Sequence, residues 1–135
     1  MLSKKMSARM DSLHELLAFL MNLAEKNGFS KDTQNRIALA AEEALVNVFS
    51  HAYRDASGDV EVRCFSPDGS SLTFEIRDAG VSFNPLERSE PDIKAGLDER
   101  RVGGMGVLIV RRMADVVAYR RESDNNILTL TFTNR

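Results

Sequence analysis

The sequence has one cysteine, Cys64, no tryptophan and only three prolines in 135 residues. A single cysteine excludes an internal disulfide and a cysteine metal cluster. The most apolar N-terminal stretch is interrupted by His14, Glu15, Asn22 and Glu25, so no run is long enough to span a bilayer. No signal-peptide pattern precedes that stretch. We therefore expect no membrane partner and a cytoplasmic location.

Neither sign of charge is in clear excess, since the net charge is only −2. The absence of a basic excess speaks against a direct nucleic-acid partner. Hydrophobic residues make up 43% of the chain, which is ordinary for a globular protein. This length and composition predict one domain over residues 1–135 with a single core.

Two helices are predicted in the first part of the chain. Ser12–Glu15 has the pattern of a capping box at the start of an apolar-periodic stretch. Gly28 is suited to end that helix as its C′ residue. Ser30 or Asp32 then caps a second helix that runs to about Tyr53. Residues 1–10 show no clear pattern, which favours a frayed start.

The rest of the chain is predicted to form two pairs of strands with one helix between them. Period-two alternation predicts strands at 59–65, 71–78, 116–121 and 127–133, and helical spacing predicts a helix at 107–115. Cys64 falls on the same strand face as Val60 and Val62 and is expected to be a small buried hydrophobe. Segregated strands and helices predict an α+β fold, a two-layer sandwich of a mostly antiparallel sheet covered on one face by helices.

Residues 84–102 stand out because they carry charges of both signs and no sustained periodicity. A long segment of this kind in a compact domain is typically a functional lid. It ends in Gly103-Gly-Met-Gly106, whose flexible backbone before a helix favours phosphate binding, with a plain hinge as the alternative. Arg100 and Arg101 lie just upstream, either to reach a terminal phosphate or to be solvated.

Polar residues line one face of the second helix. Glu43, Asn47 and His51 are spaced four residues apart in a stretch otherwise rich in alanine, leucine and valine. A carboxylate and an amide one turn apart could hold a hydrated cation and orient a hydroxyl or water towards a phosphate. The alternative is that both face solvent. His51 is interpreted as a packing or hydrogen-bonding residue rather than a base.

A second polar motif, Asp78-Ala-Gly80, stands where a predicted strand ends. An acceptor carboxylate followed by glycine can bind an amino-bearing heterocycle, because the backbone can approach the ring closely. An ordinary β-turn is the alternative.

Together, Glu43-x-x-x-Asn47, Asp78-x-Gly80, the lid and Gly104-x-Gly106 resemble the GHKL ATPase superfamily in order and spacing. Within it, the stretches around Glu43 and Gly106 resemble bacterial anti-sigma-factor serine kinases of the RsbW and SpoIIAB type. The similarity covers nearly the whole chain from about residue 10.

The resemblance implies a Bergerat-type ATP site. Asn47 would ligate Mg²⁺, and Glu43 would be the general base or orienting carboxylate for the attacking hydroxyl. Asp78 would bind the adenine amine, with Gly80 beneath the ring. This division of labour agrees with phosphoryl transfer, in which metal binding, positioning and charge neutralisation do most of the catalysis.

The phosphates would be bound by Gly104, Met105 and Gly106 as a lid of about residues 84–103 closes, with Arg101 near the terminal phosphate. The resemblance further implies a serine on an anti-anti-sigma (STAS-type) protein as phosphate acceptor, sequestration of a sigma factor, and a homodimer. Exposed apolar residues on the first helix would suit that dimer.

Three features depart from the family pattern. Ser82 replaces a glycine of many relatives and is expected to stiffen the adenine loop. Arg100-Arg-Val102 precedes the glycines where some of these kinases have an acidic residue and an arginine. The N-terminal strand of relatives is expected to be curtailed, because only about ten residues precede the first helix.

The sequence therefore favours an ATP- and Mg²⁺-dependent protein serine kinase that is also an anti-sigma factor. The alternative is a non-catalytic nucleotide-binding module that regulates a partner by sequestration. The catalytic domain of a histidine kinase is disfavoured, because no dimerising helical hairpin or acceptor-histidine segment is present.

Overall fold

A computed structural model describes residues 1–53, 57–65, 69–87 and 104–135. The elements follow the order β1, α1, α2, β2, β3, α4, β4, β5, with short 3₁₀ turns before α1 and after β3. Their bounds are Leu2–Ser7 (β1), Met10–Ser12 (η1), Leu13–Lys26 (α1), Lys31–His51 (α2), Asp59–Phe65 (β2), Ser71–Asp78 (β3), Pro85–Glu87 (η2), Gly104–Met113 (α4), Val116–Glu122 (β4) and Asn125–Thr133 (β5).

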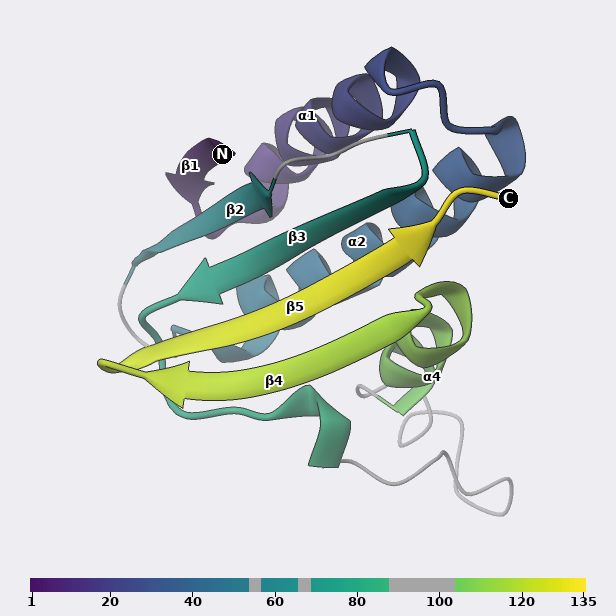
Figure 1. Cartoon of the computed structure of the whole chain (residues 1–135). Helices are drawn as coiled ribbons and strands as arrows, with labels where there is room; N and C mark the ends of the chain where they lie inside the picture. The colour runs from purple at the N-terminus through teal and green to yellow at the C-terminus, as the bar shows by residue number, and fades with distance from the viewer. Residues whose placement is uncertain (54–56, 66–68, 88–103) are drawn as a thin grey trace.

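The strands form one antiparallel sheet in the order β1-β2-β3-β5-β4. The helices lie together behind the sheet in Figure 1, and no described helix covers its other face. The predicted α+β sandwich is thus confirmed. Strands β2 and β3 have the predicted bounds, whereas β4 and β5 extend to meet at a two-residue turn. Ser123 and Asp124 have φ of 50° and 65° there, as a tight right-twisted hairpin turn requires.

The prediction of a frayed N-terminus was wrong. Residues Leu2–Ser7 form the edge strand β1, which pairs with β2 along its whole length, from Leu2 opposite Cys64 to Ser7 opposite Asp59. The sequence signal was weak because Lys4 and Lys5 blur the alternation expected of a half-buried strand. Pairing with an existing sheet edge supplies the hydrogen bonds that local propensity does not indicate.

The predicted capping box at the start of α1 was also wrong. Ser12 closes a 3₁₀ turn with φ −87° and ψ −12°, and its side chain makes no capping hydrogen bond. The extra turn places Ser12 in a helical conformation, from which a side chain does not reach the free amides of the next turn. By contrast, Ser30 caps α2 as predicted and accepts a bond from the Thr33 amide.

Glycine ends α1 as predicted, since Gly28 adopts the left-handed region with φ 77°. At the other end of the chain, α4 begins at Gly104, three residues before the predicted start at residue 107, and ends at Met113. The glycines at its start are therefore part of the helix and not only of the segment before it.

The core lies between the helices and the covered face of the sheet. Its fully buried members come from every layer: Leu16 and Leu20 from α1, Ile37 and Leu45 from α2, Val60 and Val62 from β2, Leu72, Phe74 and Ile76 from β3, and Leu130 and Phe132 from β5. Cys64 is buried among them, as predicted, and burial raises the pKa of its thiol to about 11.

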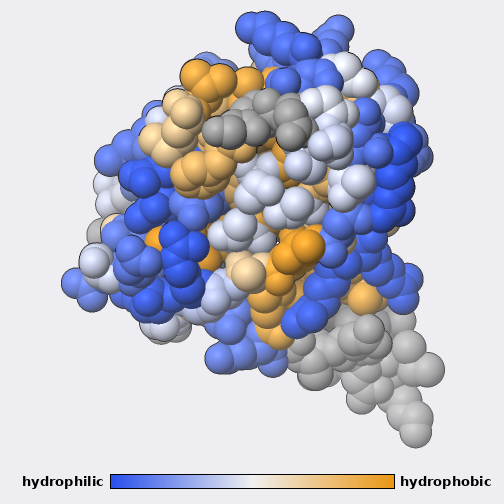
Figure 2. All heavy atoms as spheres, in the orientation of Figure 1, coloured by the Kyte–Doolittle hydropathy of each residue, from blue (hydrophilic) through white to orange (hydrophobic). Residues whose placement is uncertain are grey.

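The apolar side chains of α1 mostly face the core. Leu13, Leu17, Phe19 and Met21 are only partly exposed and pack against the core, so the expectation of an exposed apolar face on this helix was wrong. The large exposed hydrophobic side chains of the described residues are scattered instead: Met1, Leu2, Met10, Leu39, Phe65, Val81 and Val116. The uncovered sheet face is correspondingly mostly polar, with separate apolar patches (Figure 2).

Candidate functional site

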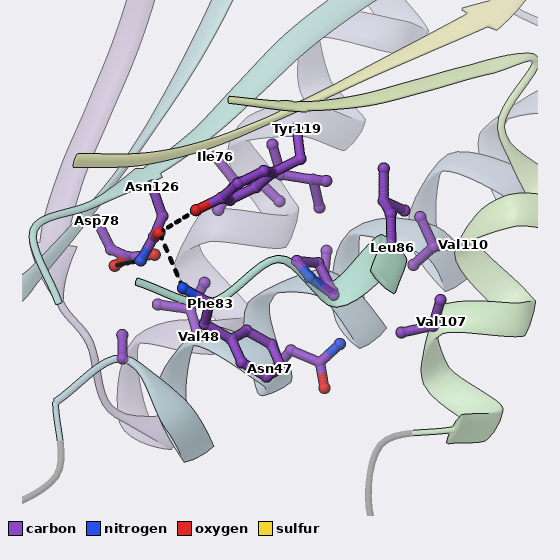
Figure 3. A pocket seen from close by; sticks show the side chains of 14 residues that line it. Asn47, Val48, Ile76, Asp78, Phe83, Leu86, Val107, Val110, Tyr119 and Asn126 are labelled. Carbon is purple, nitrogen blue, oxygen red and sulfur yellow. Dashed lines mark hydrogen bonds between the residues drawn. The ribbon is translucent and has the colours of Figure 1, made fainter. Parts of the chain in front are cut away.

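A pocket lies between the C-terminal half of α2, the start of the segment after β3, α4, and the ends of strands β3, β5 and β4 (Figure 3). Its walls are mainly apolar, and its polar lining groups gather at the strand ends and on α2. The lining residues are Ala44, Asn47, Val48, Ala52, Ile76, Asp78, Phe83, Pro85, Leu86, Val107, Val110, Tyr119, Asn126 and Leu128. An apolar pocket with a few convergent polar groups is a typical small-molecule site.

Helix α2 contributes the two polar residues that its sequence singled out. Asn47 lines the pocket, and Glu43 lies one turn earlier, half-buried where α2 packs against α4. Burial, followed by the nearby charge of Glu42, raises the pKa of Glu43 above its usual range. A carboxylate with a raised pKa is better suited to accept a proton from a hydroxyl than an ordinary exposed one.

Asp78 is the last residue of β3 and is only 6% exposed. Its Oδ1 accepts hydrogen bonds from the Gly80 amide at 2.9 Å and from the Asn126 side chain at 2.9 Å. Both bonds end on the same oxygen, which leaves Oδ2 without a described donor. Burial raises the pKa of Asp78, while the two hydrogen bonds and the Arg121 charge act in the opposite direction.

Asn126 is a site residue that sequence reasoning missed. Its Nδ2 donates to Asp78 and to the Val81 carbonyl, at 2.9 and 2.8 Å. Its Oδ1 accepts from Tyr119 Oη at 2.6 Å, Arg121 Nη1 at 3.1 Å and the Phe83 amide at 3.2 Å. With all its polar capacity used, the 5% exposed Asn126 fixes the carboxylate of Asp78 in one orientation.

The sequence did contain one signal for Asn126. A polar side chain at the start of a strand whose other covered-face residues are Leu128, Leu130 and Phe132 breaks the apolar pattern. Only the sheet register, which places Asn126 directly opposite Asp78, explains that break.

Gly80 packs against the end of α2. A Cβ at this position would lie 2.1 Å from the Ala52 carbonyl oxygen, which also accepts a hydrogen bond from the Val81 amide at 2.9 Å. Such a contact is far too short, so the absence of a side chain lets the strand end approach the helix. The close approach that we expected from a ligand ring is thus also made by the protein's own backbone.

Tyr53, just after α2, also contacts the residue next to Asp78. Its hydroxyl donates to the Asp59 carbonyl at 2.7 Å and accepts from the Ala79 amide at 2.8 Å, so it joins the end of α2 to β2 and to the residue after Asp78. The ring lies where a Cβ on Gly58 would stand. Tyr53 thus links Ala79, next to Asp78, and Asp59 of β2 to the end of α2.

Gly106, near the start of α4, faces the Glu43 carboxylate of α2. A Cβ on Gly106 would come within 2.9 Å of Glu43 Oε2. Gly104 and Met105 form the first turn of α4, where unpaired backbone amides favour an anion. Arg100, Arg101 and residues 88–103 of the expected lid lie outside the described residues.

His51 is a packing residue, as interpreted from sequence. Its ring stacks on Phe83 with a centroid distance of 4.9 Å and an interplanar angle of 24°. Ser82, which departs from the family pattern, is exposed beside this pair. The stack ties the segment after Gly80 to the end of α2.

No cluster of three or more histidine, cysteine, aspartate or glutamate side chains able to hold a metal occurs in the part of the chain that the structure describes. Helix α2 offers two oxygen donors here, the Asn47 amide and the Glu43 carboxylate. That donor set fits Mg²⁺, which keeps several waters and is commonly bound through one or two protein oxygens together with substrate phosphates.

The Asp78 carboxylate lies at one end of an apolar pocket, Asn47 and Glu43 lie on α2 beside it, and the glycine-rich start of α4 lies beyond them. These features are typical of a protein that binds a purine nucleotide. Comparison with known proteins agrees with that class. The family described as "Histidine kinase-like ATPase domain" matches residues 6–132, and the chain belongs to this family.

Curated relatives give a narrower resemblance. The chain is 26% identical over 117 residues to the serine/threonine-protein kinase BtrW of Bordetella bronchiseptica, covering 87% of this chain and 82% of that protein. It is 28% identical over 121 residues to the serine-protein kinase RsbW of Bacillus licheniformis, covering 86% and 75%. The predicted resemblance to RsbW-type kinases is thereby confirmed, and the prediction of an enzyme of the protein-kinase class agrees with these names.

Solved structures confirm the fold. The crystal structure of the RsbU and RsbW domains of Rv1364c from Mycobacterium tuberculosis matches with a TM-score of 0.67 at 14% identity, covering 100% of this chain and 33% of that one. The histidine kinase domain of a blue-light activated kinase from Erythrobacter litoralis matches with a TM-score of 0.58 at 21% identity, covering 89% and 60%. Each helix within the described ranges is too short or too polar to span a bilayer.

Proposed function

We propose that this protein is an ATP- and Mg²⁺-dependent protein serine kinase that acts as an anti-sigma factor. It phosphorylates a serine of an anti-anti-sigma (STAS-type) partner and separately sequesters a sigma factor. The observation that carries the proposal is the placement of Asp78 and Asn47 on one apolar pocket beside the start of α4. The kinase names of the relatives support the choice of reaction.

In this proposal the base of ATP is recognised at the strand end. Asp78 Oδ2 accepts from the adenine amine, because its other oxygen is already occupied by Gly80 and Asn126. Gly80 allows the backbone to approach the ring. The apolar walls from Ile76, Val110 and Leu128 bury the flat faces of the base.

The phosphates lie towards α4. Gly104, Met105 and Gly106 present backbone amides to them, and Arg101 approaches the terminal phosphate as the lid of about residues 84–103 closes. Mg²⁺, bound by Asn47 and the phosphates, would neutralise charge on the transferring group. Glu43 accepts the proton of the attacking serine hydroxyl or orients that hydroxyl.

Residues 1–135 act in this proposal as a single ATP-binding domain. The protein works in the cytoplasm as a homodimer that regulates transcription through its partners, without touching nucleic acid or membrane. The absence of a large exposed apolar face on α1 directs the search for the dimer contact to other surfaces.

Calorimetric titration of ATP with and without Mg²⁺ tests the site. Asp78→Asn keeps the shape but places an amide donor where Oδ2 stands, so ATP binding should weaken at least tenfold, about the loss of one charged hydrogen bond. Asn47→Ala should remove the Mg²⁺ dependence. Asp124→Asn, in the exposed β4–β5 turn, is the matched control and should bind like wild type. Wild type that binds no adenine nucleotide would refute the proposal.

A non-catalytic nucleotide-binding module that regulates a partner by sequestration is the second candidate. It would be favoured if Glu43, which we propose as the proton acceptor, proves dispensable. Glu43→Gln should retain ATP affinity within a few-fold and abolish phosphate transfer to an anti-anti-sigma protein, measured with radiolabelled ATP. If wild type binds ATP but transfers no phosphate, or if both proteins transfer equally, the catalytic role of Glu43 is wrong.

A further inference from the structure

The two oxygens of the Asp78 carboxylate have different surroundings. Oδ1 accepts from the Gly80 amide and from Asn126 Nδ2, both at 2.9 Å, whereas Oδ2 has no donor among the described residues. A proton taken up by this carboxylate would be carried on Oδ2, because Oδ1 faces two donors. Oδ2 is then a hydrogen-bond acceptor in the ionised carboxylate and a donor in the protonated one.

This difference matters for the choice between purine bases. Adenine carries an exocyclic amine, which donates, where hypoxanthine carries an oxygen, which accepts. An ionised Asp78 pairs with the amine, whereas it would meet the oxygen as one acceptor facing another. A site that hydrogen-bonds a ligand group discriminates strongly against an analogue that leaves its buried polar group unpaired. Whatever keeps Asp78 ionised therefore keeps the pocket selective for amino purines.

Arg121, near the end of β4, contacts both residues that bond to Asp78. Its Nη1 donates to the Gly80 carbonyl at 2.9 Å and to Asn126 Oδ1 at 3.1 Å. Gly80 and Asn126 are the donors to Asp78 Oδ1. One guanidinium nitrogen thus joins both hydrogen-bond partners of the carboxylate, through bonds that a charged donor strengthens.

The bond from Arg121 also fixes the direction of the Asn126 amide. Tyr119 Oη, at 2.6 Å from Asn126 Oδ1, can donate or accept and so does not determine which end of the amide faces it. Arg121 and the Phe83 amide can only donate, and both meet Oδ1. They leave Nδ2 to face Asp78 (Figure 3). With the amide reversed, its oxygen would face Asp78 Oδ1 and favour the protonated carboxyl.

Charge acts in the same direction as this geometry. Burial is the largest influence on the pKa of Asp78 and raises it, so the apolar surroundings favour the protonated form. The hydrogen bonds from Asn126 and Gly80 and the positive charge of Arg121 oppose burial. Loss of Arg121 would remove the charge and a bond to each of the two donors.

Other ionisable groups surround Asp78 on the remaining elements. From the end of α2 come His51, which stacks on Phe83, and Tyr53, whose hydroxyl bonds to Ala79. A second hollow, which Asp78 also borders, has these charged lining residues: Lys5, Asp59, Glu61, Arg63 and Arg77. All of these groups are shared by the variants compared below, so a difference between the variants reports the substituted residue.

We propose that Arg121 is a positioning residue that determines base specificity: it holds Asp78 as a hydrogen-bond acceptor, so that the pocket selects amino purines over oxo purines. It acts through Gly80 and Asn126 and not by touching the nucleotide. This inference rests on the proposed nucleotide site and adds a residue that sets its choice of base.

Calorimetric titration with ADP and with inosine diphosphate, whose base is hypoxanthine, tests the inference. Wild type should prefer ADP. Arg121→Met removes the charge and both bonds, and should reduce that preference by about three- to tenfold, the range expected for one charge-assisted hydrogen bond. Arg112→Met removes the same charge from an exposed position of α4 and should keep the wild-type preference. Arg121→Lys, which retains the charge and a donor, should fall between the two.

The pH dependence is a second readout, which a merely structural role would not move. Affinity for inosine diphosphate should rise as pH falls, because a protonated Oδ2 donates to the base oxygen. In Arg121→Met this rise should begin at a higher pH than in Arg112→Met. Asp78→Asn places an amide donor permanently where Oδ2 stands, and should therefore prefer inosine diphosphate at neutral as well as acidic pH.

The outcomes separate this inference from the proposed function. If Arg121→Met keeps the preference of Arg112→Met, or weakens the binding of both nucleotides equally, the role of Arg121 is overturned and the proposed function stands. If wild type binds ADP and inosine diphosphate equally well, Asp78 does not recognise the amine and this inference fails. If wild type binds no adenine nucleotide, the proposed function and this inference fail together.

Discussion

Gly80→Ala separates two roles for one glycine, contact with a ligand ring and contact with the end of α2. The added Cβ would stand 2.1 Å from the Ala52 carbonyl oxygen, 2.5 Å from its carbon and 2.7 Å from the Ala52 Cα. All three are backbone atoms, so no side chain can rotate away. The strand end or the helix end must shift by about 1 Å to restore an ordinary contact distance.

The cost of that shift can be estimated from the contacts it disturbs. Overpacking of a tight interior contact costs about 1–3 kcal/mol, and loss of the bond from the Val81 amide to Ala52 adds about 1 kcal/mol. We expect Gly80→Ala to lower the free energy of unfolding by about 2–4 kcal/mol. That is a large part of the stability of a domain of this size.

Urea unfolding of the nucleotide-free protein, followed by circular dichroism, measures this change. Gly69→Ala is the matched control, because a Cβ there would lie 3.6 Å from the Asn27 carbonyl oxygen, an ordinary contact, and should change stability by no more than about 0.5 kcal/mol. If Gly80→Ala unfolds at the wild-type midpoint but no longer binds ATP, the glycine serves the ligand alone and the packing argument is refuted.

Three further predictions concern charged and polar groups. Asn126→Asp places a second carboxylate 2.9 Å from Asp78, so the pair should share a proton and ATP affinity should fall as pH rises through its deprotonation, unlike wild type in parallel titrations. Burial raises the folded pKa of Asp78 above the unfolded value, so its contribution to stability is lost as pH rises through the folded pKa; Asp78→Asn should then unfold at higher urea than wild type at neutral pH but not at acidic pH. For Asp115, the hydrogen bond from the Thr133 amide at 2.7 Å comes first among the causes that lower the folded pKa. Its stability contribution is present above the unfolded pKa and lost as pH falls through the folded one. Asp115→Asn should therefore be less stable than wild type at neutral pH and equally stable in acid, by a small margin because Asp115 is exposed to solvent, as thermal melts across pH can show.

Much of the fold was predictable because its signals are local. The alternation in 59–65 and 71–78 indicated β2 and β3 at their true bounds, and Gly28 marked the end of α1. Apolar side chains that repeat with the period of a helix or strand indicate which face is buried, whatever the fold around them. In β1 the two lysines weaken this alternation, and the prediction for that segment failed.

The candidate site was predictable only in part, for the same reason. Glu43, Asn47 and Asp78 were found because each belongs to a short motif whose chemistry can be read along the chain. Asn126 was missed, since a single asparagine at a strand start carries no motif. Its role comes from the register of β5 against β3, a contact between residues 48 positions apart.

The sequence by itself determined the element types, the covered face of each strand and the polar residues of α2 and the β3 end, because periodicity and motif spacing are properties of neighbouring residues. The tertiary structure alone decided that β1 joins the sheet and that Asn126 orients Asp78. These contacts join residues far apart in the chain, and the free energy that selects them comes from closing the whole sheet against the helices.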